Sequence, residues 1–188
     1  MRKILFLTVL TIFAVATNAQ FGFKGGVNVS TVRGGDVSDV SSKVGFYVGP
    51  YYIIPIGNGA GVQIEAVYSG EGAKDKTSDV KLNLGYINLS ALFRYMFSGG
   101  FFLQTGPQYG FLLSAKAKDG GSVDVKDQFK TGNFAWAFAA GYDSKSGLGF
   151  YARYNLGLSK IADDGSDVKT GTFQFGLRYT LHGGGGEK

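Results

Sequence analysis

The sequence contains no cysteine and only one histidine among its 188 residues. Without cysteine, the chain can form neither a disulfide framework nor a cysteine-based metal site, and it cannot carry the acylated cysteine of a lipoprotein. The single histidine, His182, follows the last expected strand and precedes a run of glycines, whereas nucleophilic catalysis needs a histidine oriented in a shaped cleft. The sequence therefore predicts no catalytic, cofactor-binding or metal-binding site.

Long hydrophobic runs are also missing beyond the N-terminus. No segment after residue 19 approaches the ~18 consecutive apolar residues that a membrane-crossing helix needs. Residues 1–19 resemble a secretory signal peptide, because Arg2 and Lys3 precede a short apolar run and a small-residue cleavage site at 17–19. A retained N-terminal anchor is the alternative. Cleavage would remove two positive charges and lower the net charge from +5 to 5 − 2 = +3, which gives no reason to invoke nucleic acid.

Glycine and aromatic residues are abundant instead, with 31 Gly, 16 Phe and 11 Tyr, a composition that favours strands and turns over helices. The clearest pattern covers residues 101–116, where large apolar side chains alternate with Gln and Gly. Because successive side chains of a strand point to opposite faces, one face is apolar and the other is polar and small. This pattern is typical of a strand whose outside meets lipid and whose inside lines a narrow polar lumen.

Eight segments share this alternation, and each is long enough to cross a bilayer when tilted (~9–11 residues). They are residues 20–30, 43–56, 61–72, 81–97, 101–116, 132–143, 148–159 and 172–181. The alternation changes parity within the fourth segment, so we expect a β-bulge near Gly85. The predicted fold is all-β: an eight-stranded antiparallel up-and-down transmembrane β-barrel over residues 20–182, after the signal peptide and before a glycine-rich tail at 183–188.

The connections between these segments alternate in length. Residues 31–42, 73–80, 117–131 and 161–171 form long connections, whereas 57–60, 98–100 and 144–147 form short ones. A bacterial outer-membrane barrel has an even number of strands, short periplasmic turns and longer outer loops. The pattern therefore predicts a protein of the bacterial outer membrane, with both termini in the periplasm and four long loops outside.

Five charged residues fall on the predicted inner face: Lys24, Glu65, Arg94, Arg153 and Arg178. Unpaired charges would be costly there, so we expect Glu65 to pair with one or more of the cations and to help plug the lumen. An ion or solute path is the alternative. An eight-stranded barrel is narrow enough to be filled by its own side chains.

Aromatic residues on the outer face gather toward both ends of the strands, as expected for belts at the two lipid–water boundaries. They are Phe46, Tyr68, Phe111 and Phe134 near the long loops, and Phe97, Phe101, Tyr142 and Tyr179 near the short turns. The core of a soluble sandwich is the alternative explanation. Residues 163–167 are similar to a fragment of a calcium loop, but they lack the full ligand spacing and the terminal glutamate.

Several short motifs, in order along the chain, resemble the PorT-like outer-membrane β-barrel family. They lie at residues 25–28, 68–74, 84–89, 104–108, 153–158 and 173–179. The resemblance implies an eight-stranded outer-membrane barrel and a last strand that is read by the barrel-assembly machinery, through Gln174, Gly176, Tyr179 and Leu181. The chain departs from the family pattern because residues 182–188 follow that strand in place of a terminal aromatic residue.

We therefore expect an integral, non-enzymatic outer-membrane barrel with a plugged polar lumen, whose outer loops serve envelope structure or interaction. Its expected partners are outer-membrane lipid and lipopolysaccharide, and it needs no cofactor. By analogy with the family, an accessory subunit of a protein-secretion or envelope-assembly complex is the alternative. A soluble exported ligand-binding barrel of lipocalin type would need an apolar lumen, and an outer-membrane enzyme would need a site built from carboxylates alone.

Overall fold

The computed structural model describes residues 20–34, 40–75, 81–119, 121–161 and 168–181. The strands are β1 (Gln20–Arg33), β2 (Val40–Gly57), β3 (Ala60–Asp75), β4 (Lys81–Met96), β5 (Phe101–Asp119), β6 (Gly121–Asp124), β7 (Gly132–Asp143), β8 (Leu148–Gly157) and β9 (Lys169–Leu181). A 3₁₀ turn, η2 (Lys126–Gln128), follows β6. Within these ranges, no helix has the length and apolar character required to cross a membrane.

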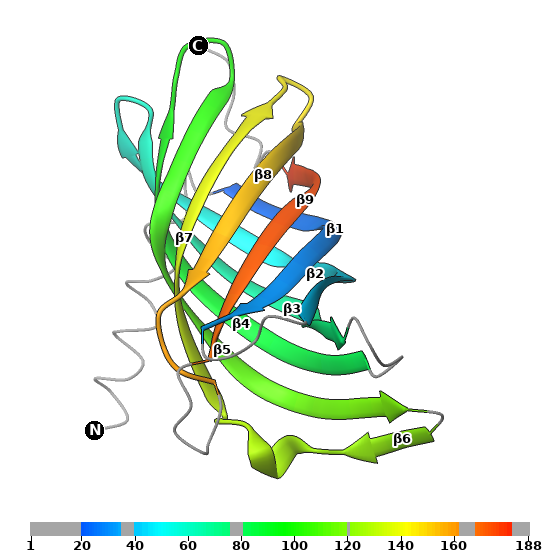
Figure 1. Cartoon of the computed structure of the whole chain (residues 1–188). Coiled ribbons are helices and arrows are strands. Elements are labelled where there is room, and N and C mark those ends of the chain that lie inside the picture. Colours follow the sequence, from blue (N-terminus) through cyan, green and yellow to red (C-terminus); the bar gives the residue numbers. More distant parts are fainter. Residues whose placement is uncertain (1–19, 35–39, 76–80, 120, 162–167, 182–188) are drawn as a thin grey trace, which may run out of the picture.

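The strands form one closed antiparallel barrel of eight strands, as the sequence predicts. Each of the eight wall strands pairs with the next one along the chain, with β7 following β5 in the wall, and β1 closes the wall against β9 (Figure 1). The closure is long, since its register runs from Phe21 opposite Leu181 to Arg33 opposite Lys169. A closed barrel leaves no unpaired edge in its wall, which is the condition for a sheet to sit in lipid.

The side-chain alternation is inverted relative to a soluble barrel. On β5, the Phe101 side chain is 45% exposed on the outer wall, whereas Phe102 is completely buried inside. Outward positions of the barrel strands carry mainly apolar side chains, whereas inward positions hold the buried Lys, Arg, Glu, Asn and Gln together with some buried aromatic and aliphatic side chains such as Tyr51 and Leu92. The predicted β-bulge is present, as a register shift between Gly85 and Tyr86 where β4 pairs with β5.

One connection differs from the prediction. Residues 117–131 were expected to be a loop, but β5 continues to Asp119 and pairs with β6, so this hairpin extends beyond the barrel wall (Figure 1). Unpaired backbone groups at the end of β5 find partners in β6, which is the physical reason for the extra strand. The predicted signal peptide, the glycine-rich tail, His182 and the calcium-like residues 163–167 lie outside the described residues.

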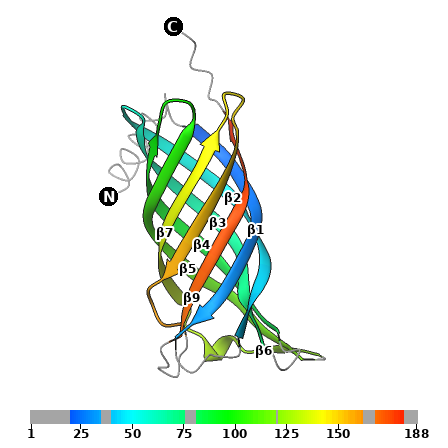
Figure 2. The same ribbon diagram turned by 45° about the horizontal axis from the view of Figure 1, so that its top comes forward.

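The two ends of the barrel differ in shape (Figure 2). Three tight turns at 57–60, 97–101 and 143–148 lie at one end, and the β5–β6 hairpin lies at the other. All three tight turns contain left-handed backbone, at Asn58 (φ 51°) in the first, Gly99 (φ 95°) in the second and Gly147 (φ 86°) in the third, which glycine adopts without strain and asparagine tolerates.

Candidate functional site

A three-residue ion cluster crosses the middle of the barrel. Glu65 on β3 binds Lys24 on β1 through a 2.6 Å contact between Nζ and Oε2. Arg153 on β8 approaches from the opposite wall and donates two bonds, from Nη1 to Oε2 at 2.7 Å and from Nη2 to Oε1 at 2.8 Å. All three side chains are almost completely buried. The bidentate geometry makes this the strongest class of charged hydrogen bond, and it joins walls of the barrel that do not pair with each other.

The strand alternation explains why these residues meet. Lys24, Glu65 and Arg153 each occupy an inward position on their strand, and their long side chains reach across a lumen that other buried side chains also fill. Because the interior of an eight-stranded barrel is just wide enough for side chains, the charges have no route to bulk water and must satisfy one another.

A second ion cluster lies nearer the short turns. Asp143, the last residue of β7, receives a 2.6 Å contact from Arg94 Nη2 and a 3.3 Å contact from Arg178 Nε. The structure therefore divides the four predicted lumen cations between two carboxylates: Lys24 and Arg153 pair with Glu65, whereas Arg94 and Arg178 pair with Asp143. Asp143 was not among the predicted site residues, because its place at the end of a strand gave no sign that its carboxylate turns inward.

Glutamines connect the two ion clusters. Gln63 Oε1 accepts hydrogen bonds from Arg178 Nη2 at 3.1 Å and from Gln104 Nε2 at 2.7 Å, while Gln63 Nε2 donates to Glu65. Gln63 is completely buried. The network thus runs continuously from the turn end to the middle of the barrel.

Buried aromatic rings fill the space between the charges. The Arg178 guanidinium lies 4.2 Å from the centre of the Tyr51 ring, and the Arg94 guanidinium lies 4.6 Å from the centre of Phe102. Lys24 Nζ lies 5.2 Å from the centre of Tyr151. These cation–π contacts were not expected from sequence, which emphasised the polar residues of the inner face. The inward parity of Tyr51 and Tyr151 is the signal that could have found them.

The half of the lumen nearer the long loops is also occupied. Glu71 on β3 accepts hydrogen bonds from Ser69 Oγ (2.9 Å), Asn88 Nδ2 (3.2 Å) and Thr172 Oγ1 (3.2 Å). Beyond this polar layer, four buried side chains form an apolar cluster across β4 and β5: Leu84, Tyr86, Leu112 and Ala115. Side chains therefore fill the barrel at every level from the short turns to the long-loop end.

Nothing in the described ranges assembles a metal site, since no three His, Cys, Asp or Glu side chains lie close enough to share an ion. The buried carboxylates instead face arginine, lysine, amide and hydroxyl groups that already occupy their oxygens. Such an arrangement holds strands together and leaves no oxygen of Glu65 open to a solute.

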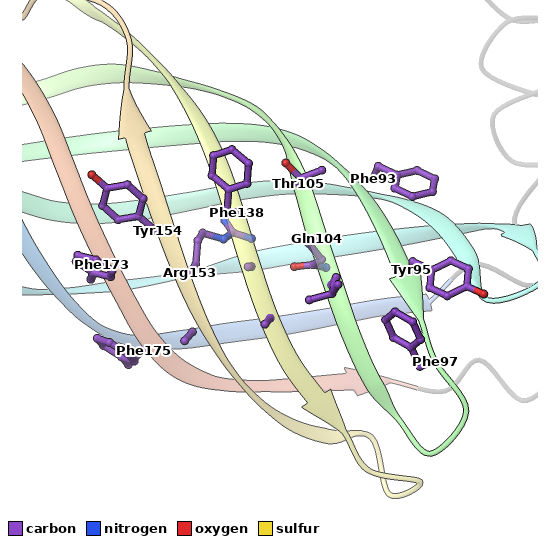
Figure 3. Close-up of a pocket in the computed structure, with 14 residues that line it drawn as sticks. Phe93, Tyr95, Phe97, Gln104, Thr105, Phe138, Arg153, Tyr154, Phe173 and Phe175 are labelled. Atoms are coloured by element: carbon purple, nitrogen blue, oxygen red, sulfur yellow. The ribbon is translucent and has the colours of Figure 1, made fainter.

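The outer wall carries an apolar groove of about 780 Å³ across β4, β5, β7, β8 and β9 (Figure 3). Ala140 and Ala152 are paired directly across β7 and β8 and form its floor, between the larger side chains Leu103 and Phe175. Phe138, Tyr154 and Phe173 form one wall. On the same surface, Trp136 is 36% exposed and donates a 2.8 Å hydrogen bond from Nε1 to Thr105 Oγ1. A wall this apolar is suited to contact with acyl chains.

Comparisons with known proteins agree with this geometry. Residues 14–163 match a family model described as Outer membrane protein beta-barrel domain. Among solved structures, the chain is similar to Ail, the attachment invasion locus protein of Yersinia pestis, with 20% identity, a TM-score of 0.54, and coverage of 88% of this chain and 100% of Ail. It is also similar to Neisserial surface protein A, with 16% identity, a TM-score of 0.55, and coverage of 87% and 99%. No curated protein matches the sequence.

Proposed function

The chain belongs to the outer membrane protein beta-barrel domain family, and from this premise we propose that it is a closed, non-enzymatic barrel with a structural role in the bacterial outer membrane. The observation that carries this proposal is the occupation of the lumen by the Lys24–Glu65–Arg153 cluster. Both oxygens of Glu65 are bound by cations from two different walls, so a permeating ion would have to displace a bidentate salt bridge.

The proposal extends to topology. The sequence motifs described above support three further parts of the proposal: signal-peptide cleavage before Gln20, insertion by the barrel-assembly machinery and a PorT-like identity. The long connections and the β5–β6 hairpin then lie outside the cell, and both termini lie in the periplasm. The lengths of the connections support this orientation, because barrels of this class keep their short turns on the periplasmic side.

Single-channel recording tests the closed lumen. The purified full chain, inserted into planar lipid bilayers, should give no steady current, because no continuous water path crosses the ion clusters. Arg153→Ala removes the bidentate bond and part of the filling volume, and it should produce measurable openings. Lys145→Ala is the matched control, since Lys145 is exposed in a short turn and should leave the barrel closed. A steady current through the parent protein would overturn the proposal.

A second candidate function is that of an accessory subunit in a secretion or assembly complex. The observation that favours it is β6, which pairs with β5 alone and lies at the end of the sheet order, with Val123 64% exposed. An exposed edge strand can accept a strand from another protein. Cross-linking in the native outer membrane would support this role if one protein partner were recovered in near-stoichiometric amount. Recovery of the barrel with lipid alone would favour the stand-alone role.

A further inference from the structure

The outer surface of β3, β4 and β5 changes character in regular steps toward the long-loop end. Strand register places four rows of outward residues across these three strands, and the rows follow one another in this order: Tyr68, Ile87 and Phe111; then Gly70, Gly85 and Ser114; then Gly72, Asn83 and Lys116; then Lys74, Lys81 and Lys118. The surface therefore passes from aromatic and aliphatic to small, then to polar, and finally to cationic.

The last row brings like charges together. Lys81 on β4 lies directly opposite Lys74 on one side and Lys118 on the other, and Lys116 lies two residues from Lys118 on the same face of β5. Directly opposite like charges destabilise a sheet, and adjacent strands are only ~4.8 Å apart. Among the side chains that the structure describes, that of Asp124 on β6 belongs to a residue opposite Lys116, and its Oδ1 accepts a hydrogen bond from the backbone of Lys126. An anion at this surface would relieve the repulsion.

A notch lies on the outer surface next to the lysines, on the side toward the middle of the barrel. Gly70, Gly85 and Ser114 form its floor, and the wall toward the middle of the barrel is made by Phe46 and Tyr68, whose ring centres are 5.7 Å apart. Lys43 and Lys116 also line this notch, which has a volume of about 290 Å³. Lys43 Nζ donates a 2.9 Å hydrogen bond to the Glu71 carbonyl oxygen. The notch is thus apolar and aromatic toward the membrane and cationic toward the loops.

Along the membrane normal, the lysines lie at the level that lipid headgroups would occupy. Lys116 lies two rows beyond the aromatic row, which is about 10 Å higher for a strand that rises ~3.3 Å per residue and tilts by ~40°. Aromatic side chains mark the boundary between hydrocarbon and headgroups, and lysine side chains can extend along the surface toward a phosphate. A free anion in solution would gain nothing from the aromatic wall, whereas a lipid would contact both parts of the surface.

We propose that this outer rim, formed by Lys81, Lys116 and Lys118 above the Gly70–Gly85–Ser114 notch, binds the phosphate groups of an anionic phosphorylated lipid in the outer leaflet. The inference rests on the proposed orientation, in which the long-loop end faces outward. It adds a defined lipid site to a barrel whose role is otherwise structural.

Native mass spectrometry of the full-length protein in detergent tests the site, with diphosphoryl lipid A and its dephosphorylated form as probes. The parent should retain diphosphoryl lipid A at least tenfold better than the dephosphorylated form. The triple variant Lys81→Gln, Lys116→Gln and Lys118→Gln should lose this preference. The triple variant Arg33→Gln, Lys130→Gln and Lys145→Gln changes the net charge equally at exposed positions outside β3, β4, β5 and β6, and it should keep the preference.

Two results would overturn the lipid site: no preference for the phosphorylated lipid in the parent, or an equal loss in both triple variants. The orientation is tested separately. Because the chain has no native cysteine, Ser122→Cys on β6 and Ser146→Cys in a short turn can each be treated on intact cells with a membrane-impermeant maleimide. Labelling of Ser146→Cys alone would overturn the orientation, while the result in detergent would still decide whether the rim binds phosphate.

Discussion

Arg153 and Glu65 are 88 residues apart in the chain, yet they form a bidentate salt bridge across the lumen, with both N–O distances at 2.7–2.8 Å. Lys24 binds the same carboxylate from a third strand. One carboxylate therefore pairs with two cations, which come from β1 and β8. Removal of Glu65 leaves two buried cations without their counter-charge, and this makes Glu65 the most sensitive position of the cluster to substitution.

Glu65→Gln should destabilise the folded barrel by about 3–5 kcal/mol, because it leaves Lys24 and Arg153 buried without a counter-charge. Urea unfolding in lipid vesicles, followed by Trp136 fluorescence, would measure the change in the free energy of unfolding. Asp124→Asn is the matched control, since Asp124 is exposed on β6, and it should change stability by less than ~1 kcal/mol. Equal stability of Glu65→Gln and the parent would show that the cluster contributes nothing to folding.

Replacement of all three residues of the cluster should lower the free energy of unfolding less than Glu65→Gln does. In Lys24→Met, Glu65→Leu and Arg153→Met combined, no unpaired charge remains, and apolar side chains occupy a similar volume. Buried ion clusters are often replaced in this way with little or no loss of stability. The triple variant should therefore unfold at a higher urea concentration than Glu65→Gln alone. If the triple variant were less stable than Glu65→Gln, the intact ion cluster would stabilise the barrel more than apolar side chains of similar volume do.

Asp143→Asn should loosen the turn end of the lumen. The substitution removes the charge that Arg94 and Arg178 share, while Arg178 keeps its bonds to Gln63 and to Tyr51. We expect a loss of about 1.5–3 kcal/mol, the range for a hydrogen bond to a charged group. The urea midpoint is the measurement, and Lys145→Ala, at an exposed position of the same turn, is the control. A loss of stability larger than that of Glu65→Gln would contradict the expectation that the Glu65 cluster contributes more to stability than the Asp143 cluster.

Trp136 should report directly on the outward apolar face. It is the single tryptophan of the chain and lies on the lipid-facing wall with its indole bonded to Thr105. Lipids with brominated acyl chains should therefore quench its fluorescence strongly, while aqueous acrylamide should quench it weakly. Thr105→Val removes the hydrogen bond but leaves the indole outside, so the quenching pattern should persist. Strong quenching by acrylamide alone would place this wall in water.

Gly26→Ala should impair barrel closure. Gly26 on β1 lies directly opposite Gly176 on β9, and a Cβ atom at Gly26 would collide with the Phe175 carbonyl oxygen. Because the backbone would have to shift where the first and last strands pair, we expect the folded barrel to be destabilised by about 1–3 kcal/mol. The measurement is the fraction of unboiled protein that keeps its folded mobility on a gel. Gly121→Ala has open space around its Cβ position and should fold like the parent.

The sequence by itself determined the type of fold and its inside-out character. A period-two alternation over eight segments can satisfy its backbone and its apolar faces only as a closed sheet in lipid, so the bounds of the strands at 81–96 and 132–143 were predictable to within a residue. The same parity placed Lys24, Glu65, Arg94, Arg153 and Arg178 on the inner face. The β-bulge beside Gly85 followed from a change in that parity.

Only the tertiary structure decided which charges meet. Parity gives the face of a strand but not the height of a residue in a tilted barrel, and height depends on the register accumulated around all eight strands. For this reason Glu65 meets Arg153 and Lys24, while Arg94 and Arg178 meet Asp143, which no pattern had singled out. The alignment of Lys74, Lys81 and Lys118 across three strands has the same origin, because registers of separate hairpins are fixed only when the barrel closes.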